Sequence, residues 1–169
     1  IHMNQQLWTK KYRPNSLDEY VFTSENQKQK FKKWINDGVL PHMLLTGQPG
    51  VGKTAIIYAL LHELKVEDYD ILEVNASKDN GVDFIKEKVT NFAENGGFGN
   101  MRYVFLDEAD GLSANSQSVL RGTIEKYDNC VRFLLTGNYQ HKIIPALKSR
   151  CEVGRMHIEK LDEGEFYGK

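Results

Sequence analysis

Several features that would mark a secreted, metal-binding or membrane-spanning protein are missing from this sequence. It contains only two cysteines, Cys130 and Cys151, which form neither a C-x-x-C motif nor a metal-ligand spacing. We therefore expect reduced, structural thiols in an intracellular protein. No apolar run approaches the roughly 20 residues that span a bilayer, and no secretory signal occurs. These absences predict a soluble, cytoplasmic protein with no membrane partner.

An excess of charge of one sign is missing as well. The 22 basic and 23 acidic residues give a formal net charge of −1. This balance excludes a uniformly basic nucleic-acid binder, but it leaves room for a local basic surface. With 169 residues, 40% of them hydrophobic, the chain is long enough for one domain with its own core. Residues 1–3, Ile-His-Met, resemble an expression remnant, so we expect the fold to begin at residue 4.

One glycine-rich segment carries the strongest functional signal. The run Gly47-Gln48-Pro49-Gly50-Val51-Gly52-Lys53-Thr54 fits the phosphate-binding pattern G-x-x-x-x-G-K-[ST]. It follows an apolar run and leads into a helix-like run, which is the strand–loop–helix context that the motif needs. The glycines let backbone N–H groups converge on a triphosphate, and the helix adds its positive end. Lys53 is expected to reach the β- and γ-phosphates and Thr54 to hold Mg²⁺, whereas a Gly-rich turn that fits by accident is the competing interpretation.

Strand-like and helix-like segments alternate along the chain. This alternation predicts an α/β fold with a parallel sheet covered by helices on both faces. We expect strands buried on both faces at 42–46, 71–75, 103–107, 132–136 and, more weakly, 152–157. We expect helices at 25–37, 53–64, 82–94 and 113–127, and a short helix near 142–148 broken by Pro145. In such a sheet, ligands bind beyond the carboxyl ends of the strands.

Polar residues follow two of the expected strands at that edge. The apolar run Tyr103-Val104-Phe105-Leu106 ends in two acids, Asp107 and Glu108. The first carboxylate can hold Mg²⁺, and the second can orient the attacking water or accept its proton. Asn138 ends the next strand, where its amide can bond the γ-phosphate and the water. Alone, a surface acidic turn and a plain Gly-Asn turn explain these residues, but the phosphate loop upstream favours a nucleotide site.

Basic side chains carry weaker signals. Arg150 has the planar guanidinium that suits phosphate oxygens, although a lone arginine is more often a surface charge. Lys78, Lys86 and Lys88 form the one basic group placed where DNA could be met, and a solvated helix face is the more common explanation for such a group. His42 and the other histidines show no ligand spacing, and we interpret them as structural or solvent-facing.

Short motifs follow one another in a recognisable order from about Leu7 to Arg155. Besides the phosphate loop they are Lys11-Tyr12-Arg13-Pro14, Val74-Asn75-Ala76-Ser77, Asp107-Glu108-Ala109-Asp110, Gln117 with Leu120-Arg121, Gly137-Asn138-Tyr139 and Ser149-Arg150-Cys151. Together they resemble the first domain of an AAA+ sliding-clamp loader subunit, of the replication factor C small-subunit and T4-type phage kind. The resemblance implies a RecA-like P-loop NTPase fold, a three-layer α/β/α arrangement around a five-stranded parallel sheet. It also implies an ATPase core at residues 4–160 and the start of a helical lid domain at 161–169.

The resemblance assigns roles in ATP binding and hydrolysis. It implies that ATP or ADP is bound by the phosphate loop from Gln48 to Thr54, with Mg²⁺ held by Thr54 and Asp107. Lys53, Asp107, Glu108 and Asn138 would be the catalytic residues of the chain's own site. Arg150 would act in trans, as an arginine finger on the ATP of a neighbouring subunit. The adenine pocket would be lined by Tyr12, Arg13, Pro14, Val21 and Phe22.

The resemblance also implies macromolecular partners. These are the other subunits of a pentameric loader, the sliding clamp and primer–template DNA. Gln117 would couple DNA contact to the acidic motif. Phe98, a large ring in the Gly-rich loop 94–100, is a candidate anchor on the clamp, although packing on its own core explains it equally well. The residues expected to face the DNA backbone, reading phosphate rather than sequence, are Lys78, Asn80, Gly81, Lys86 and Ser113.

The predicted function is ATP-driven loading of a sliding clamp at primer–template junctions. A viral or phage version is favoured, because Val21-Phe22-Thr23-Ser24 stands where cellular relatives carry a V-x-G-Q-like segment and Asn80-Gly81 where they often carry Arg-Gly. The lid and collar of such subunits do not appear before Lys169, so we expect an excised domain with weak nucleotide binding and little basal ATPase activity.

Other functions compete with clamp loading. Another AAA+ DNA motor or helicase loader stays open, as does a structural subunit that holds ATP without hydrolysing it. Glu108 argues against the structural subunit, because such a subunit has no use for a carboxylate that activates water. A DEAD-box helicase lobe, suggested by Asp107 to Asp110, is rejected because Thr136-Gly137-Asn138 stands where helicases carry S-A-T.

Overall fold

A five-stranded parallel sheet forms the centre of the molecule. The computed structural model describes residues 25–49, 52–78, 81–96 and 99–155. The strands lie in the order β2-β3-β4-β1-β5, and every neighbouring pair is parallel. The predicted five-stranded parallel sheet is therefore confirmed, and residues 156–157 of the last predicted strand lie outside the described residues. The strand bounds are β1 Met43–Thr46, β2 Ile71–Asn75, β3 Arg102–Asp107, β4 Val131–Gly137 and β5 Glu152–Arg155.

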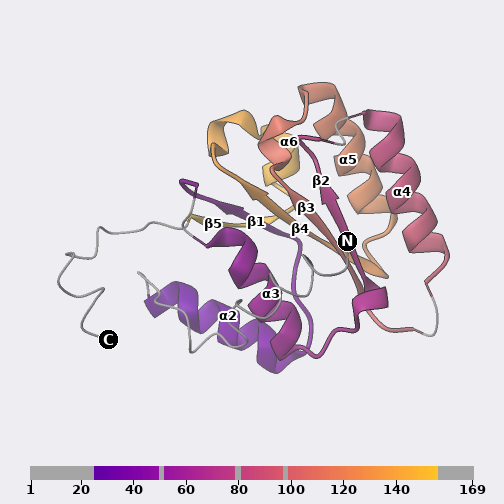
Figure 1. Cartoon of the computed structure of the whole chain (residues 1–169). Helices are drawn as coiled ribbons and strands as arrows, with labels where there is room; N and C mark the ends of the chain where they lie inside the picture. Colours follow the sequence, from indigo (N-terminus) through magenta and orange to yellow (C-terminus); the bar gives the residue numbers. More distant parts are fainter. Residues whose placement is uncertain (1–24, 50–51, 79–80, 97–98, 156–169) are drawn as a thin grey trace, which may run out of the picture.

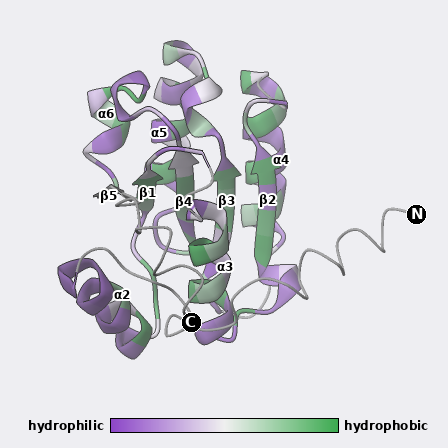
Figure 2. Cartoon of the chain, turned by 60° about the vertical axis from the view of Figure 1, so that its left-hand side comes forward, coloured by the Kyte–Doolittle hydropathy of each residue, from purple (hydrophilic) through white to green (hydrophobic). Residues whose placement is uncertain are grey.

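Helices cover both faces of the sheet, as the three-layer prediction requires. One face carries α2 (Glu25–Asp37) and α3 (Lys53–Glu63), and the other carries α4 (Val82–Glu94), α5 (Ala114–Lys126) and α6 (Pro145–Lys148) (Figure 1). Two apolar clusters fill the spaces between the layers. Figure 2 shows the hydrophobic residues concentrated along the strands. Within the described ranges no helix is long and apolar enough to cross a membrane.

Local chemistry sets the ends of several helices. Helix α2 ends at Asp37, and the following Gly38 has a φ of 79°, a left-handed conformation that glycine adopts without steric cost. Helix α5 begins after Ser113, whose hydroxyl oxygen accepts a hydrogen bond from Ser116 N at 3.1 Å. The single helix expected near 142–148 is instead a 3₁₀ turn at 140–142 followed by α6. Pro145 causes this break, because it forces Ile144 into an extended conformation.

Strand β2 corrects the expectation that every strand is buried on both faces. Residues of β1 and the apolar run of β3 are fully buried, whereas β2 lies at an edge of the sheet. Its Val74 is buried and its Glu73 is exposed. Periodicity revealed the strand but not its place in the order, because an edge strand and a central strand can carry similar apolar runs.

The two cysteines are free, as predicted. Cys151 packs against the apolar cluster beneath α4, α5 and α6. Burial raises the pKa of the Cys151 thiol to about 12, so this sulfur stays protonated and unreactive at neutral pH. Cys130 is exposed, and its Sγ lies 3.6 Å from the Tyr127 carbonyl oxygen.

A buried arginine joins β3 to the segment before β2. Arg102 Nε donates to Asp70 Oδ1 at 3.1 Å and Nη2 donates to the Tyr69 carbonyl at 2.6 Å, while Nη1 donates to the Phe92 carbonyl. The guanidinium carbon also lies 3.6 Å from the centroid of the Phe92 ring. Both side chains of the Arg102–Asp70 pair are about nine-tenths buried, so removing one partner leaves an uncompensated charge.

We predict that Arg102→Ala lowers the free energy of unfolding by about 3–5 kcal/mol, because Asp70 then stays buried without its cation. The measurement is the urea midpoint at pH 7. Arg121→Ala is the matched control: its pair with Glu125 is exposed, and its loss costs less than about 1 kcal/mol. Equal losses in the two variants would contradict the buried-pair explanation.

His42 is a buried histidine with both ring nitrogens engaged. Nδ1 accepts from Phe133 N at 3.1 Å, and Nε2 donates to Asp128 Oδ1 at 2.6 Å. The sequence interpretation of a structural histidine agrees with this geometry. Burial lowers the pKa of His42 below its ordinary value of 6.5, and nearby Arg132 lowers it further, while the bond to Asp128 opposes both. A proton on Nδ1 would also remove the acceptor of Phe133 N.

The unfolded chain binds a proton at His42 near pH 6.5, whereas the folded chain binds it only at lower pH. Between these values the unfolded state holds more protons, so we expect the free energy of unfolding to fall as the pH drops below about 6.5. Asp128, whose pKa is lowered chiefly by its bond to His42, adds a further loss only below about pH 4. Urea unfolding between pH 5 and 8 measures the slope.

His42→Asn should flatten that slope, because it keeps a side-chain acceptor near Phe133 N and removes the titrating ring. His62→Asn, at an exposed position of α3, is the control that should keep the slope. The explanation is wrong if the slope in His42→Asn equals that of the unchanged protein.

Candidate nucleotide site

The carboxyl ends of four parallel strands bring the predicted site residues to one edge of the sheet. Thr46 pairs with Gly137, so the phosphate loop and Asn138 leave the sheet side by side. Asn75 pairs with Asp107 at the ends of β2 and β3. Strand β3 also pairs with β4. The register thus places the glycine-rich loop, the acidic pair and Asn138 together, as the sequence predicted.

Lys53 is the centre of this edge. It opens α3 directly after Gly52, whose φ of 86° lets the loop turn into the helix. Its Nζ donates to the carbonyls of Gly47 at 2.7 Å and Gln48 at 2.9 Å, and to Asn138 Oδ1 at 3.1 Å. Burial lowers the pKa of Lys53, while the carboxylates of Asp110 and Asp107 oppose that shift. The ammonium therefore lies within the field of both acids.

The acidic pair is fixed by Thr136 of the neighbouring strand. The Thr136 hydroxyl donates to Asp107 Oδ1 at 2.6 Å and accepts from Glu108 N at 3.3 Å. Glu108 itself has a φ of 57° and a ψ of 46°, a left-handed conformation that is uncommon for a residue with a side chain. Such strain is concentrated at functional sites. The left-handed conformation turns the chain sharply after Asp107. As a result, the Asp107 carboxyl contacts Thr136 while the Glu108 carboxyl contacts Ser77.

The Glu108 side chain reaches back toward β2. Its Oε2 accepts from the Ser77 hydroxyl, which also lies 2.7 Å from Asn75 Oδ1. One hydroxyl proton can serve only one of these two acceptors at a time. Asn75 Oδ1 additionally accepts from Ser77 N at 3.0 Å, which fixes the turn after the strand. Ser77 therefore contacts the Glu108 carboxylate, and Asn75 fixes the turn that carries Ser77.

Asp110 orients the turn that carries Asn138. Its Oδ2 accepts from Asn138 N at 2.9 Å and from Tyr139 N at 3.0 Å. A Cβ at position 137 would approach the Asp110 carboxyl carbon to 3.3 Å. Gly137 therefore allows the carboxylate to reach the turn without crowding. The result is a chain of contacts from Lys53 through Asn138 to Asp110.

These residues fit a nucleoside triphosphate with Mg²⁺. Lys53 is buried among carbonyl oxygens and an amide, so it is a donor that a terminal phosphate can engage. Thr54 lies in the first turn of α3, where the helix end favours anions. Asp107 has one oxygen held by Thr136, which leaves the other for a metal. Carboxylate, hydroxyl and phosphate oxygens are the ligands that Mg²⁺ prefers.

Arg150 lies away from this edge, whereas Gln117 contacts the segments that follow β3 and β4. Arg150 precedes β5 and forms an ion pair with Glu125 of α5. Gln117 is buried; its amide nitrogen donates to the carbonyls of Leu112 and Lys142, and its oxygen accepts from Ile144 N at 2.8 Å. Gln117 thus joins α5 to the segment that follows Asn138, and its predicted coupling role stays a prediction.

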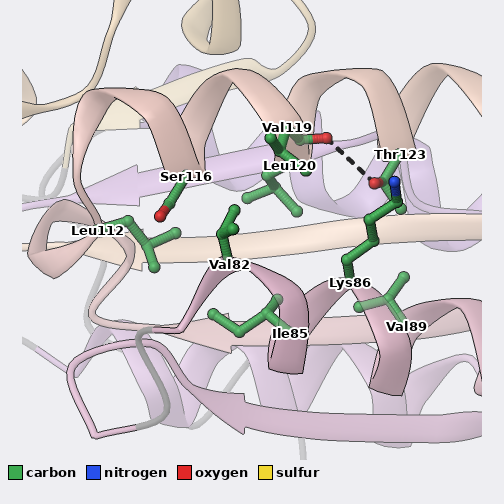
Figure 3. Close-up of a pocket in the computed structure, with 9 residues that line it drawn as sticks. All are labelled: Val82, Ile85, Lys86, Val89, Leu112, Ser116, Val119, Leu120 and Thr123. Atoms are coloured by element: carbon green, nitrogen blue, oxygen red, sulfur yellow. Dashed lines mark hydrogen bonds between the residues drawn. The ribbon is translucent and has the colours of Figure 1, made fainter.

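The described residues predicted to face DNA gather at α4 and α5. Gly81 precedes α4 and Ser113 caps α5, while Lys78 is exposed in the turn after β2. An apolar groove between the helices has Lys86 at its rim, with its stem extended toward Thr123 (Figure 3). This placement fits either a phosphate contact or a solvated helix face, so these assignments stay predictions.

Several predicted residues lie outside the described residues. They are Tyr12, Arg13, Pro14, Val21 and Phe22 of the adenine pocket, Gly50 and Val51 of the phosphate loop, Asn80 and Phe98.

Three residues of the site were missed as functional residues by sequence reasoning: Thr136, Asp110 and Ser77. Each acts by holding a predicted residue across a distance of 28 to 31 positions in the chain. Asp110 and Thr136 stand close in sequence to the predicted Asp107 and Asn138, and this closeness could have marked them. Ser77 ends the recognised motif Val74-Asn75-Ala76-Ser77, but nothing in that motif indicates a contact with Glu108.

Comparisons with known proteins agree with this site. The family described as "ATPase family associated with various cellular activities (AAA)" matches residues 43–157. The chain is 42% identical over 164 residues to a replication factor C small subunit of Sulfurisphaera tokodaii, covering 93% of this chain and 49% of that protein. It is 40% identical over 154 residues to a replication factor C small subunit of Methanocella arvoryzae, covering 89% and 48%. The chain spans about half the length of these curated relatives.

A solved structure shows the same fold. The RuvB Holliday junction branch migration motor of Thermotoga maritima aligns with a TM-score of 0.63 at 25% identity, covering 85% of this chain and 47% of that chain. The predicted fold class is thereby confirmed, and the predicted ATPase is confirmed at the level of the family. Both curated relatives are archaeal, and the phage origin stays a prediction.

We predict that Asp110→Ala lowers ATP turnover of the assembled full-length protein by about tenfold to a hundredfold. Asn138 loses the carboxylate that holds its backbone, and a displacement of about 1 Å at a catalytic group has effects of this size. ATP binding should persist, because Lys53 and the phosphate loop are unchanged. Turnover and nucleotide affinity are measured separately, with Glu67→Ala, an exposed residue before β2, as the control. Unchanged turnover in Asp110→Ala would show that the turn needs no such support.

Proposed function

Because this chain belongs to the AAA family of ATPases, we propose that it is the ATPase domain of a clamp-loader subunit. ATP binding and hydrolysis would open a sliding clamp and load it at primer–template junctions. The identity of about 40% to replication factor C small subunits over most of the chain supports this function. The single structural observation that carries the proposal is the bonding of Lys53 to both the phosphate loop and Asn138.

Each site residue has a definite task in hydrolysis. Lys53 would exchange its carbonyl and amide partners for the β- and γ-phosphate oxygens, which are stronger acceptors because they are charged. Asn138 would orient the γ-phosphate, and Glu108 would orient the attacking water and accept its proton. Thr54 and Asp107 would hold Mg²⁺. When bound, the ion would neutralise the negative charge that develops on the phosphates.

Arg150 would complete the site of a neighbouring subunit. Strands β1 and β5 are parallel, with Met43 beside Glu152, so Arg150 lies before the amino ends of these strands. The phosphate loop follows their carboxyl ends. Four residues of strand separate the two edges by about 13 Å, so Arg150 lies at the opposite edge of the sheet from its own chain's phosphate loop. The geometry therefore favours action in trans.

We further propose several copies in a pentameric loader, an intracellular location and contacts with DNA and the clamp. The DNA backbone would be contacted by lysine side chains and by the amino ends of two helices, both of which suit phosphate. These residues are Lys78, Gly81, Lys86 and Ser113. Phe98 would contact the clamp.

Another AAA DNA motor is the second candidate function, because the fold is shared with a branch migration motor. Loading of a cognate clamp onto primed DNA by the full-length protein would distinguish the clamp loader from such a motor.

Hydrolysis can be separated from ATP binding with one substitution. We predict that Glu108→Gln lowers DNA-stimulated turnover about a hundredfold or more while ATP still binds, because only the proton acceptor is lost. Turnover and ATP affinity of the assembled full-length protein are the measurements. Unchanged turnover would favour a subunit that holds ATP as a structural element.

A mixing experiment tests whether Arg150 acts in trans. Full-length chains carrying Lys53→Ala lack a working site but keep the finger, and chains carrying Arg150→Ala keep the site but lack the finger. We predict that each assembly alone hydrolyses ATP about 10³-fold or more slowly than the unchanged one, and that a mixture recovers part of the activity. If the mixture stays as inactive as its components, Arg150 does not act on a neighbour.

A further inference from the structure

We propose that Glu125 is a positioning residue for Arg150, holding the guanidinium in the orientation that it needs before a neighbouring subunit arrives. This inference rests on the proposed function, in which Arg150 acts on the neighbour's ATP. Arg150 Nη2 lies 2.6 Å from Glu125 Oε1. This is a short charge-assisted contact between two side chains that are separated by 25 positions in the chain.

A second arginine contacts the Glu125 carboxylate at the same oxygen. Arg121 Nη1 lies 3.4 Å from the same Glu125 oxygen, one helical turn earlier on α5. The two arginines thus share one acceptor. Arg121 restricts the rotamers of the Glu125 side chain, and Glu125 in turn restricts those of Arg150. The orientation of the Arg150 guanidinium is therefore tied to α5.

The backbone around Arg150 is fixed relative to α5. Arg150 N donates to the Leu147 carbonyl at 3.1 Å, which closes the end of α6. Leu147 and Ile124 belong to the same apolar cluster. Gln117 of α5 accepts from Ile144 N just before α6. The base of the finger and the helix that carries Glu125 therefore form one packed unit, and the Glu125 contact adds the missing restraint at the tip of the side chain.

The same contact leaves the finger usable. Among the described residues, Glu125 is the one acceptor that engages the Arg150 guanidinium, and it does so through a single nitrogen. A guanidinium carries five N–H donors, so donors remain for a phosphate. Arg150 also lines an open hollow of about 400 Å³, together with Trp34, Pro41 and Arg132. Its side chain is half exposed.

The physical gain is preorganisation. A free arginine side chain samples many rotamers, and each must be given up when the guanidinium meets the γ-phosphate. A restraint present beforehand reduces that entropy loss at the moment of reaction. The opposing effect is partial neutralisation of the guanidinium by Glu125. Both groups are well exposed, so water screens this neutralisation, and the orientational gain is the larger effect.

The test uses the mixed full-length assembly, so that Glu125 is changed only on the chain that donates the finger. Acceptor chains carry Arg150→Ala, and donor chains carry Lys53→Ala with or without Glu125→Gln. We expect Glu125→Gln in the donor to lower kcat about three- to fivefold, as the loss of one exposed charge pair allows, with the KM for ATP unchanged. The acceptor site is identical in both mixtures, so an effect on kcat alone identifies the finger.

Two further donors give the controls. Lys53→Ala with Glu67→Ala changes an exposed residue before β2 and should keep kcat within about twofold. Lys53→Ala with Glu125→Asp keeps the charge on a shorter side chain and should give an intermediate kcat. Thermal midpoints of all donors should agree, because Glu125 is at the surface.

The outcomes separate this inference from the proposed function. If unmodified donors restore no activity, the trans finger itself is wrong. If they restore it and Glu125→Gln leaves kcat unchanged, or raises it as a blocking contact would, the positioning role is overturned. A lower thermal midpoint in the Glu125→Gln donor, accompanied by an equal loss in the Glu125→Asp donor, would overturn it also, because general destabilisation would then explain the effect.

Discussion

A buried ammonium group governs the nucleotide edge of this molecule. Lys53 is held by two carbonyls of its own loop and by Asn138 at the end of a neighbouring strand. A charge in this position is tolerated only because each of its donors has an acceptor. The same requirement fixes the loop, the start of α3 and the end of β4 relative to one another, so the polar edge has a defined shape.

From Lys53 the ordered contacts extend across the sheet through hydrogen bonds that side chains form with other side chains and with the backbone. Asp110 holds the turn at Asn138, Thr136 holds both acids, and Ser77 holds Glu108. Each link joins the carboxyl end of one strand, or the turn after it, to that of another strand. The parallel sheet supplies this proximity, because consecutive crossovers return every strand to the same starting edge. The site is a property of the strand order as much as of the motifs.

Motifs and periodicity predicted the strands, the sheet and the core of the site, because these depend on residues close in sequence. Lys53, Asp107 and Asn138 were identified from their motifs and meet at one edge. The edge position of β2 was not predicted, because apolar runs do not encode strand order. The partners of the site residues were also missed: the contact of Glu125 with Arg150 joins a helix to a turn across 25 positions, and no local pattern marks such a pair.

The left-handed backbone at Glu108 has a consequence for the stability of the fold. A residue with a Cβ costs about 1–3 kcal/mol in that conformation, whereas glycine occupies it freely. A glycine at position 108 would therefore relax the turn, but it would also remove the carboxylate that Ser77 contacts. Folding stability and the polar edge thus make opposite demands on this one residue.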